Sequence, residues 1–253
     1  MKTFRWLANS RWLLAATMLV ALSVGAADPA TDSGKTRVLL VTGGHDYERE
    51  PFLAIFKSFS DVSFKHVEHP KAQAFFEPES AKSFDVLVLY DMWQKIDEAT
   101  KTNFLKLFQS GKGVVVLHHA IANYNEWDPY AEIIGARYYL QPKTVNGVEK
   151  ARSVWLHDVE HTIHIADPAH PVTKGIKDFP IHDETYNLFD VVPGVKLLLT
   201  TEEPTSNKII AWAKDYEKSR LVYIQLGHDH FAFDNPNYRQ LVLQAIRWTA
   251  RKD

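Results

Sequence analysis

Histidine-containing motifs follow three apolar runs of the sequence, at the points where buried strands are expected to end. His45 stands in TGGHDY, His118 and His119 stand in LHHA, and His228 stands in LGHD. Histidine exchanges protons near neutral pH and is also the commonest metal ligand in proteins. Two or three histidines with one carboxylate suit Zn²⁺ or a similar divalent ion. These residue types therefore predict acid–base or metal-assisted chemistry.

A fourth polar motif, HDETYN at residues 182–187, adds a carboxylate and a tyrosine to the candidate site. We expect His119, His228 and Glu184 to be catalytic residues or the ligands of a divalent metal such as zinc. Aromatic faces with a polar tip suit contact with a sugar ring. The expected substrate-binding residues are His45, Asp46, Tyr47, Trp93, His118, Tyr186 and Asp229. The sequence leaves open which of the two adjacent histidines faces the substrate.

A second group of histidines, His157, His161 and His164, has a spacing that would place them on one face of a helix. The surrounding residues are rich in β-branched side chains, which favours a strand. On a strand His161 and His164 point to opposite faces, so this group does not predict a metal site. The compact signatures HExxH for zinc and GxGxxG for dinucleotides are absent from the sequence.

Apolar runs alternate with helical periodicities and supply the elements that must position these motifs. Strands are expected at residues 37–41, 62–67, 85–90, 113–117, 196–200, 208–213 and 220–225. Helices are expected to begin near Pro51, after the N-cap Asp97 and after the N-cap Asn235. This alternation predicts a three-layer, flavodoxin-like α/β fold with a mostly parallel sheet and helices on both faces. The histidine motifs should then converge at the carboxyl ends of the strands.

The first residues have the layout of a secretory signal peptide. Basic residues precede the apolar run WLLAATMLVALSV, and the small residues of GAAD follow it. We expect a signal peptide over residues 1–26, cleaved after Ala26 or Ala27, a linker over 27–36 and a single domain over 37–253. The apolar run is shorter than the roughly 20 residues of a membrane-spanning helix, with an uncleaved anchor as the alternative. The expected location is the periplasm or the exterior, with no membrane contact after cleavage.

Charge and cysteine content exclude several functions. The net charge of −2 over 253 residues provides no basic surplus for a phosphate backbone, so nucleic acid is not an expected partner. The chain contains no cysteine. Disulfides, lipid attachment through cysteine and a cysteine nucleophile are therefore excluded.

Four motifs in order resemble the ThuA-like (trehalose utilisation) family over residues 37–250. They are VTGGHDYE, GVVVLHHAI, HPVTKGI with DETYN, and RLVYIQLGHD with NPNYRQLVLQAIRW. The resemblance implies a fold like that of class I glutamine amidotransferases and a role in the breakdown of disaccharides or keto-sugars. In that superfamily a nucleophilic cysteine follows the central strand, where this chain has His118 and His119. The resemblance therefore implies a retained pocket without glutamine hydrolysis.

These observations favour an exported enzyme of carbohydrate breakdown that acts on a disaccharide or keto-glycoside as hydrolase, lyase or isomerase. The alternative is a periplasmic sugar-binding module that uses the same pocket without catalysis. A structural or assembly domain is a third hypothesis. The expected partner is a small carbohydrate, and the sequence leaves homo-oligomerisation and the identity of the substrate open.

Overall fold

The computed structural model describes residues 34–252, together with Met1. Its centre is a nine-stranded sheet in the order β2-β1-β3-β4-β13-β12-β11-β8-β9. The expected signal peptide and nearly all of the expected linker lie outside the described residues, so both stay predictions. Within the described part of the chain, no helix has the length and apolar character needed to cross a bilayer.

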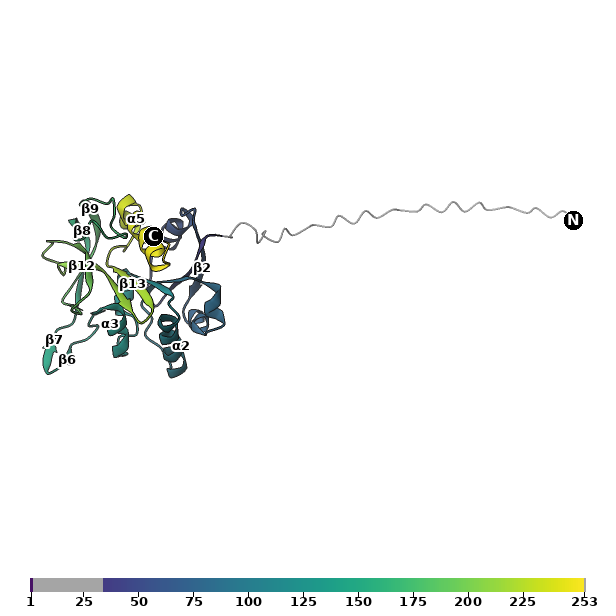
Figure 1. Ribbon diagram of the computed structural model, residues 1–253, viewed down its shortest axis with the longest axis horizontal. Helices are drawn as coiled ribbons and strands as arrows, with labels where there is room; N and C mark the ends of the chain where they lie inside the picture. Colours follow the sequence, from purple (N-terminus) through teal and green to yellow (C-terminus); the bar gives the residue numbers. More distant parts are fainter. Residues whose placement is uncertain (2–33, 253) are drawn as a thin grey trace. The chain divides into compact units, whose positions relative to one another are not determined.

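The first half of the sheet is parallel and lies on the side of the molecule that carries β2 (Figure 1). The histidine motifs follow strands of this half, at its carboxyl edge. Neighbouring strands β2, β1, β3, β4 and β13 all run in one direction. Their bounds are Val62–Glu68, Thr36–Gly43, Val86–Asp91, Gly113–Leu117 and Ser219–Ile224. The apolar runs 37–41, 62–67, 85–90, 113–117 and 220–225 are therefore strands, as the sequence predicts.

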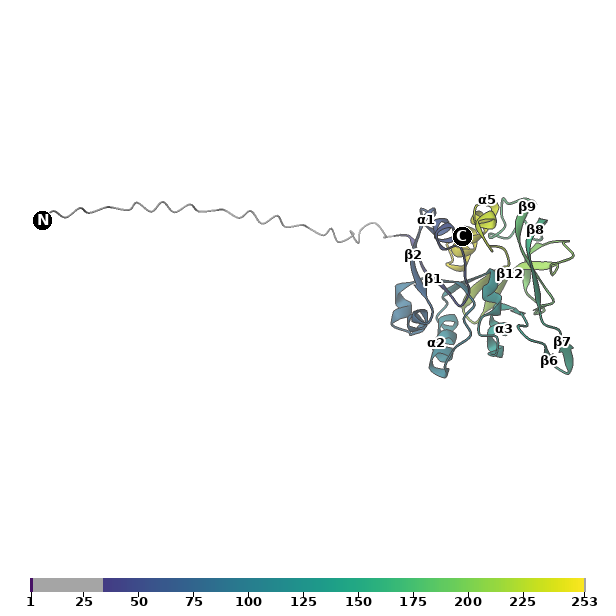
Figure 2. The ribbon, with the colours of Figure 1, turned by 180° about the vertical axis from the view of Figure 1, so that it is seen from behind.

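The second half of the sheet is antiparallel and lies on the side of the molecule away from β2 (Figures 1 and 2). It contains β12 (Ile209–Tyr216), β11 (Lys196–Thr200), β8 (Val154–Ile165) and β9 (Phe179–Asn187). Short pairs flank it, β5 (Ala136–Arg137) with β10 (Asp190–Val191) and β6 (Lys143–Val145) with β7 (Val148–Lys150). The sheet is thus mixed, whereas the sequence predicted a mostly parallel one.

Helices cover both faces of the sheet because successive strand residues point to opposite sides. Val38 and Leu40 pack with Phe52 and Leu241 on the face of α1 (Arg49–Lys57), α4 (His230–Phe233) and α5 (Pro236–Thr249). The alternate residues pack on the other face with the remaining helices. These are α2 (Glu98–Gln109), α3 (Asp128–Ile134), η2 (Lys71–Phe76), η3 (Ser80–Ser83) and η4 (His118–Ala122). The predicted three-layer α/β arrangement is confirmed.

Helix boundaries follow the capping residues of the sequence. The Asp97 side chain accepts a hydrogen bond from Thr100 at the start of α2, and Asn235 caps α5 with Pro236 as its first residue. Helix α1 begins at Arg49, two residues before the expected Pro51.

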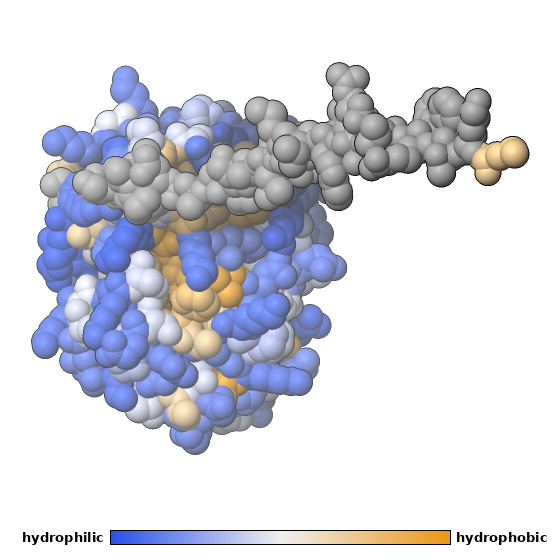
Figure 3. All heavy atoms as spheres, turned by 90° about the vertical axis from the view of Figure 1, so that its right-hand side faces the viewer, coloured by the Kyte–Doolittle hydropathy of each residue, from blue (hydrophilic) through white to orange (hydrophobic). Residues whose placement is uncertain are grey.

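On the face that carries β2, hydrophilic residues surround a strip of apolar ones (Figure 3).

Candidate functional site

Three parallel strands bring their terminal histidines to one edge of the sheet. His45 follows β1, His118 follows β4, and His228 lies in the loop after β13. Strand β3 separates β1 from β4, and β13 pairs with β4. The imidazole of His45 stacks on that of His119 with 4.6 Å between ring centroids. The predicted convergence of the three motifs is therefore present.

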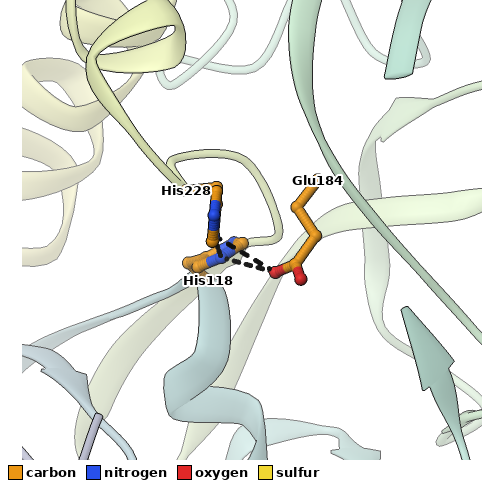
Figure 4. Close-up of side chains that lie close together, drawn as sticks. All are labelled: His118, Glu184 and His228. Atoms are coloured by element: carbon orange, nitrogen blue, oxygen red, sulfur yellow. Dashed lines mark hydrogen bonds and ion pairs between the residues drawn. The ribbon is translucent and has the colours of Figure 1, made fainter. Parts of the chain in front are cut away.

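His118, Glu184 and His228 form a compact triad (Figure 4). The distance from His118 Nε2 to Glu184 Oε2 is 3.0 Å, and His228 Nδ1 lies 3.4 Å from the same oxygen. The two histidine nitrogens are 3.3 Å apart. His118 is completely buried, and only 7% of the Glu184 side chain is exposed. One carboxylate oxygen and two imidazole nitrogens thus point at a common centre.

The surroundings of His118 fix which of its nitrogens faces this centre. Its Nδ1 lies 2.7 Å from the carbonyl oxygen of Gln225, which can only accept a hydrogen bond, so Nδ1 carries the proton. Nε2 therefore faces Glu184 and His228, and the hydroxyl of Tyr186 lies 2.9 Å from it. A backbone carbonyl that holds the remote nitrogen is the usual support of a metal-binding histidine.

The triad fits a tetrahedral metal ion. With Zn–N and Zn–O bonds of about 2.0–2.2 Å, tetrahedral ligand atoms lie about 3.3 Å apart. The three distances between ligand atoms in the triad are 3.0, 3.3 and 3.4 Å. Two histidines and one carboxylate also match the protein ligands of a catalytic zinc site, which leaves one coordination position open. The donor set can therefore hold Zn²⁺ or a similar divalent ion.

The electrostatics of the triad keep its carboxylate charged. Burial alone would raise the pKa of Glu184, but hydrogen bonds with His118 and His228 outweigh burial and lower the pKa well below its usual range. The hydrogen bond with Glu184 raises the pKa of His228, against the opposing effect of burial. Burial lowers the pKa of the neighbouring His119 well below its usual value. Near neutral pH the site therefore holds an ionised carboxylate beside a neutral His119.

A β-bulge in β8 adds a third histidine to Glu184. Pairing between β8 and β9 shifts between Leu156 and Val159, so two residues of β8 stand opposite one residue of β9. His157, within the bulge, places Nδ1 3.2 Å from Glu184 Oε1, and its ring lies 4.5 Å from that of His228. Both oxygens of Glu184 thus contact imidazoles: Oε2 contacts His118 and His228, and Oε1 contacts His157.

Asp183 fixes the loop that carries His228. Its carboxylate, 1% exposed, accepts hydrogen bonds from the backbone N–H groups of Gly227, His228 and Glu184. The hydroxyl of Tyr90 donates to the carbonyl oxygen of Gly227 from the other side. These bonds join the end of β13 to β9 and hold His228 next to Glu184.

A cavity of about 170 Å³ opens beside the triad. Glu184, His119, His45 and His157 contribute polar groups to its wall, and Tyr186 contributes an aromatic face. Nε2 of His119 is buried and has no hydrogen-bond partner among the described residues. A cavity with a few convergent polar groups is the usual form of a small-molecule site.

The family model described as "ThuA: Trehalose utilisation" matches residues 37–249 of the sequence. The chain belongs to the ThuA family. No curated protein is similar enough in sequence to count as a match. The buried triad and the cavity are therefore features of a ThuA protein without cysteine.

Solved structures show the same fold. A ThuA-like protein from Parabacteroides merdae superposes with a TM-score of 0.69 at 19% identity, covering 85% of this chain and 90% of that one. A ThuA-like protein from Bacteroides uniformis gives 0.65 at 19% identity, covering 91% and 96%. PurLQS from Thermotoga maritima, with a TM-score of 0.54 at 9% identity and coverages of 85% and 99%, relates the fold to glutamine amidotransferases.

The structure of this ThuA protein separates the predicted site residues. His45, His119, Glu184 and Tyr186 line the cavity, and His228 joins the triad at its wall. Of the other five predicted residues, His118 belongs to the triad and four lie elsewhere. Asp46 and Tyr47 border a different surface hollow, Trp93 stacks on His69, and Asp229 caps α4.

The predicted metal set needs one correction, because the triad contains His118 where the sequence analysis placed His119. His118 adopts a left-handed backbone conformation with φ 52° at the end of β4. This turn sends its side chain toward His228, whereas the His119 ring lies against His45 and Tyr90. His119 faces the cavity, and His118 lies behind it.

Sequence reasoning missed His157, Asp183 and a buried pair formed by His69 and Asp91. His157 was set aside with His161 and His164, which do lie apart from the site. They contact Thr201 and Asp178, respectively. Nε2 of His69 lies 2.9 Å from Asp91 Oδ2 in a fully buried contact. His157 and Trp155, two residues apart, both line the cavity. This position follows from the register of β8 with β9, which the sequence does not show.

Proposed function

We propose that this ThuA protein is a metal-assisted enzyme that acts on one sugar ring of a keto-glycoside or disaccharide. The observation that carries the proposal is the triad of His118, Glu184 and His228, whose ligand atoms lie 3.0–3.4 Å apart and whose Glu184 lines the cavity. The family description, trehalose utilisation, supports a carbohydrate as the substrate. The absence of cysteine excludes thioester chemistry.

Each residue of the site has a defined task. His118, Glu184 and His228 would hold the ion, which when bound acts as a Lewis acid on a substrate oxygen. His157, whose side chain is 43% exposed, contacts Glu184 on one side and the cavity on the other, so it can move a proton to or from the sugar. His119 lines the cavity and would contact the bound ring. Tyr186 orients His118 and supplies an aromatic wall.

Turnover before and after metal removal tests this proposal. A panel of disaccharides and their keto derivatives is incubated with the purified protein, and products are followed by mass spectrometry. We expect turnover that a chelator abolishes and that one added divalent ion restores. Binding of sugars without any turnover would favour the alternative, a sugar-binding module. Turnover that survives chelation would leave acid–base catalysis by histidine alone.

We also propose that the protein works outside the cytoplasm, on the basis of the basic and apolar residues that precede the domain. Two structural relatives from Salmonella are named cytoplasmic proteins, which favours the opposite location. Fractionation of cells that express the full chain provides the test. A product that begins near Asp28 in the periplasm or medium is expected, and a full-length product confined to the cytoplasm would contradict export.

A further inference from the structure

The cavity wall carries one carboxylate and one guanidinium. Among the described residues that line it, Glu184 is the one acidic side chain and Arg152 is the one arginine or lysine, with three histidines beside them. Both oxygens of Glu184 already contact imidazoles of the protein. The carboxylate is therefore not available to neutralise Arg152, and the cavity is electrostatically suited to a negative group.

Arg152 is an exposed cation held on a fixed backbone. Its guanidinium has no hydrogen bond or ion pair within the described part of the chain. The next residue, Ser153, is buried, and its hydroxyl and backbone make hydrogen bonds with Tyr139 and Leu188. The backbone beside Arg152 is thus anchored, although its charged group is unpaired. An unpaired guanidinium at a cavity can bind a carboxylate or phosphate with two parallel hydrogen bonds.

The hydroxyl of Tyr138 is a second donor close to Arg152. Tyr138 lines the cavity and is 6% exposed, and its hydroxyl makes no hydrogen bond with other described residues. Burial and the charge of Glu184 raise the pKa of Tyr138 to about 12, while the nearby charge of Arg152 opposes them. The hydroxyl therefore stays protonated at physiological pH and can donate to an oxyanion.

The size of the cavity limits its contents to one ring. Its volume of about 170 Å³ is below the roughly 300–1,000 Å³ of pockets that enclose drug-sized ligands. Trp155 lines the cavity and is 52% exposed, and its ring packs 4.5 Å from that of His157. A single sugar ring fits inside, and the rest of a larger substrate would extend past Trp155 into solvent.

We propose that the cavity selects an anionic sugar ring, with its carboxylate or phosphate bound by Arg152 and Tyr138. This inference rests on the proposed carbohydrate function and defines its substrate class. The hydroxyl or keto groups of the ring would face His119 and His157, which line the same cavity. The substrate of this ThuA protein is then an acidic sugar or its glycoside, and a neutral sugar binds weakly.

Isothermal titration with matched sugars tests this selection on the intact protein. Glucuronate and glucose differ only at the carboxylate, and glucose 6-phosphate tests whether phosphate serves as well. We expect glucuronate or glucose 6-phosphate to bind at least about tenfold more tightly than glucose, the gain of one charge-assisted hydrogen bond. Added salt should weaken the binding of the charged sugar and leave that of glucose unchanged.

Three variants identify the residues responsible. R152Q should bring the ratio of the Kd for glucose to the Kd for the charged sugar down to about one. Y138F should lower this ratio to a value between those of R152Q and the wild type. K177Q, which removes an exposed positive charge outside the cavity, should leave the preference unchanged. Thermal unfolding of each variant shows whether the fold is kept, and R152Q changes only an exposed side chain.

Equal affinity for glucuronate and glucose, or a preference that R152Q keeps, would overturn the inference, as would a wild-type protein that binds none of the three sugars. This outcome is separate from the failure of the proposed enzyme, because the titration requires no turnover. A protein that prefers the charged sugar but never converts a sugar would retain this inference and lose the proposed catalysis. Metal-dependent turnover of neutral sugars alone would support the proposed catalysis and contradict the preference for an anionic sugar.

Discussion

At the scale of single residues, the two adjacent histidines have different tasks because their backbones differ. His118 takes a left-handed conformation, φ 52°, and points back to Gln225 and the triad. His119 continues into η4 and presents its ring to the cavity. Sequence alone could place the pair at a strand end, but it could not assign the two side chains. A non-glycine residue with positive φ is uncommon and has no signature in the histidine pair itself.

Substitution of each histidine in turn distinguishes the two roles. H118A removes a ligand atom, so we expect the affinity for Zn²⁺ to fall by more than about a hundredfold, beyond the effect of losing a supporting group. H119A should keep the metal affinity within a few-fold. Competition with a chromophoric chelator measures both values. A loss of affinity in H119A but not in H118A would show that the metal set predicted from sequence was right.

At the scale of elements, the site depends on a loop and a bulge. The loop after β13 carries His228 and needs Gly227, which has φ +113° and lies so close to Tyr238 that an added Cβ would collide with its hydroxyl. The bulge in β8 turns His157 toward Glu184. The sequence predicted β8 as a strand, but a bulge depends on the register with β9, which no local pattern contains.

G227A should destabilise the fold through both the strained backbone and the collision with Tyr238. We expect a loss of about 2–3 kcal/mol in the free energy of unfolding, measured with urea. G194A is the matched control, because Gly194 also has positive φ, +89°, but has nothing within 4 Å of the added Cβ. It should cost about 1 kcal/mol. Equal losses in the two variants would mean that the close approach to Tyr238 is not as described.

An ion pair at the base of the parallel strands gives stability that depends on pH. Asp85 contacts the Arg37 guanidinium at 2.7 Å, and these hydrogen bonds outweigh the effect of burial and lower the pKa of Asp85. Because the pKa is lower in the folded state, the stabilisation is complete above the unfolded-state pKa of about 4 and is lost as pH falls through the folded-state value.

D85N should therefore be less stable than the wild type at pH 7, and the difference should shrink below about pH 4. Urea unfolding at a series of pH values measures this. D215N, which removes an exposed carboxylate of β12 that makes no ion pair in the described residues, is the control and should show no such trend. A D85N difference that is constant from pH 3 to pH 7 would refute the role of the ion pair.

At the scale of the whole molecule, the sequence predicted the layered fold and the edge at which the site lies. Apolar runs showed the strands, and Asp97 and Asn235 showed two helix starts. The sequence did not show that the later strands are antiparallel, because strand direction is set by connections and not by local composition. The sequence analysis assigned no element to Glu184, which lies on β9 and reaches the histidines across the sheet edge.

A bound ion would join the two halves of the sheet, because His118 and His228 follow parallel strands and Glu184 lies on an antiparallel one. Zn²⁺ at about a hundred times its Kd should stabilise the folded state by about 2.7 kcal/mol. For a chain of this length that raises Tm by about 5–10 °C. Scanning calorimetry with and without Zn²⁺ measures the shift, and E184Q is the control that should lose most of it. An equal shift in E184Q would place the ion elsewhere.

The most direct test of the account is the position of a metal ion in crystals soaked with Zn²⁺ and measured at the zinc absorption edge. We predict one anomalous peak per chain, about 2.0–2.2 Å from Nε2 of His118, Oε2 of Glu184 and Nδ1 of His228. A fully soaked crystal with no peak among these three atoms, or with its peak on His119 and His45 instead, would contradict the metal site on which the proposed function rests.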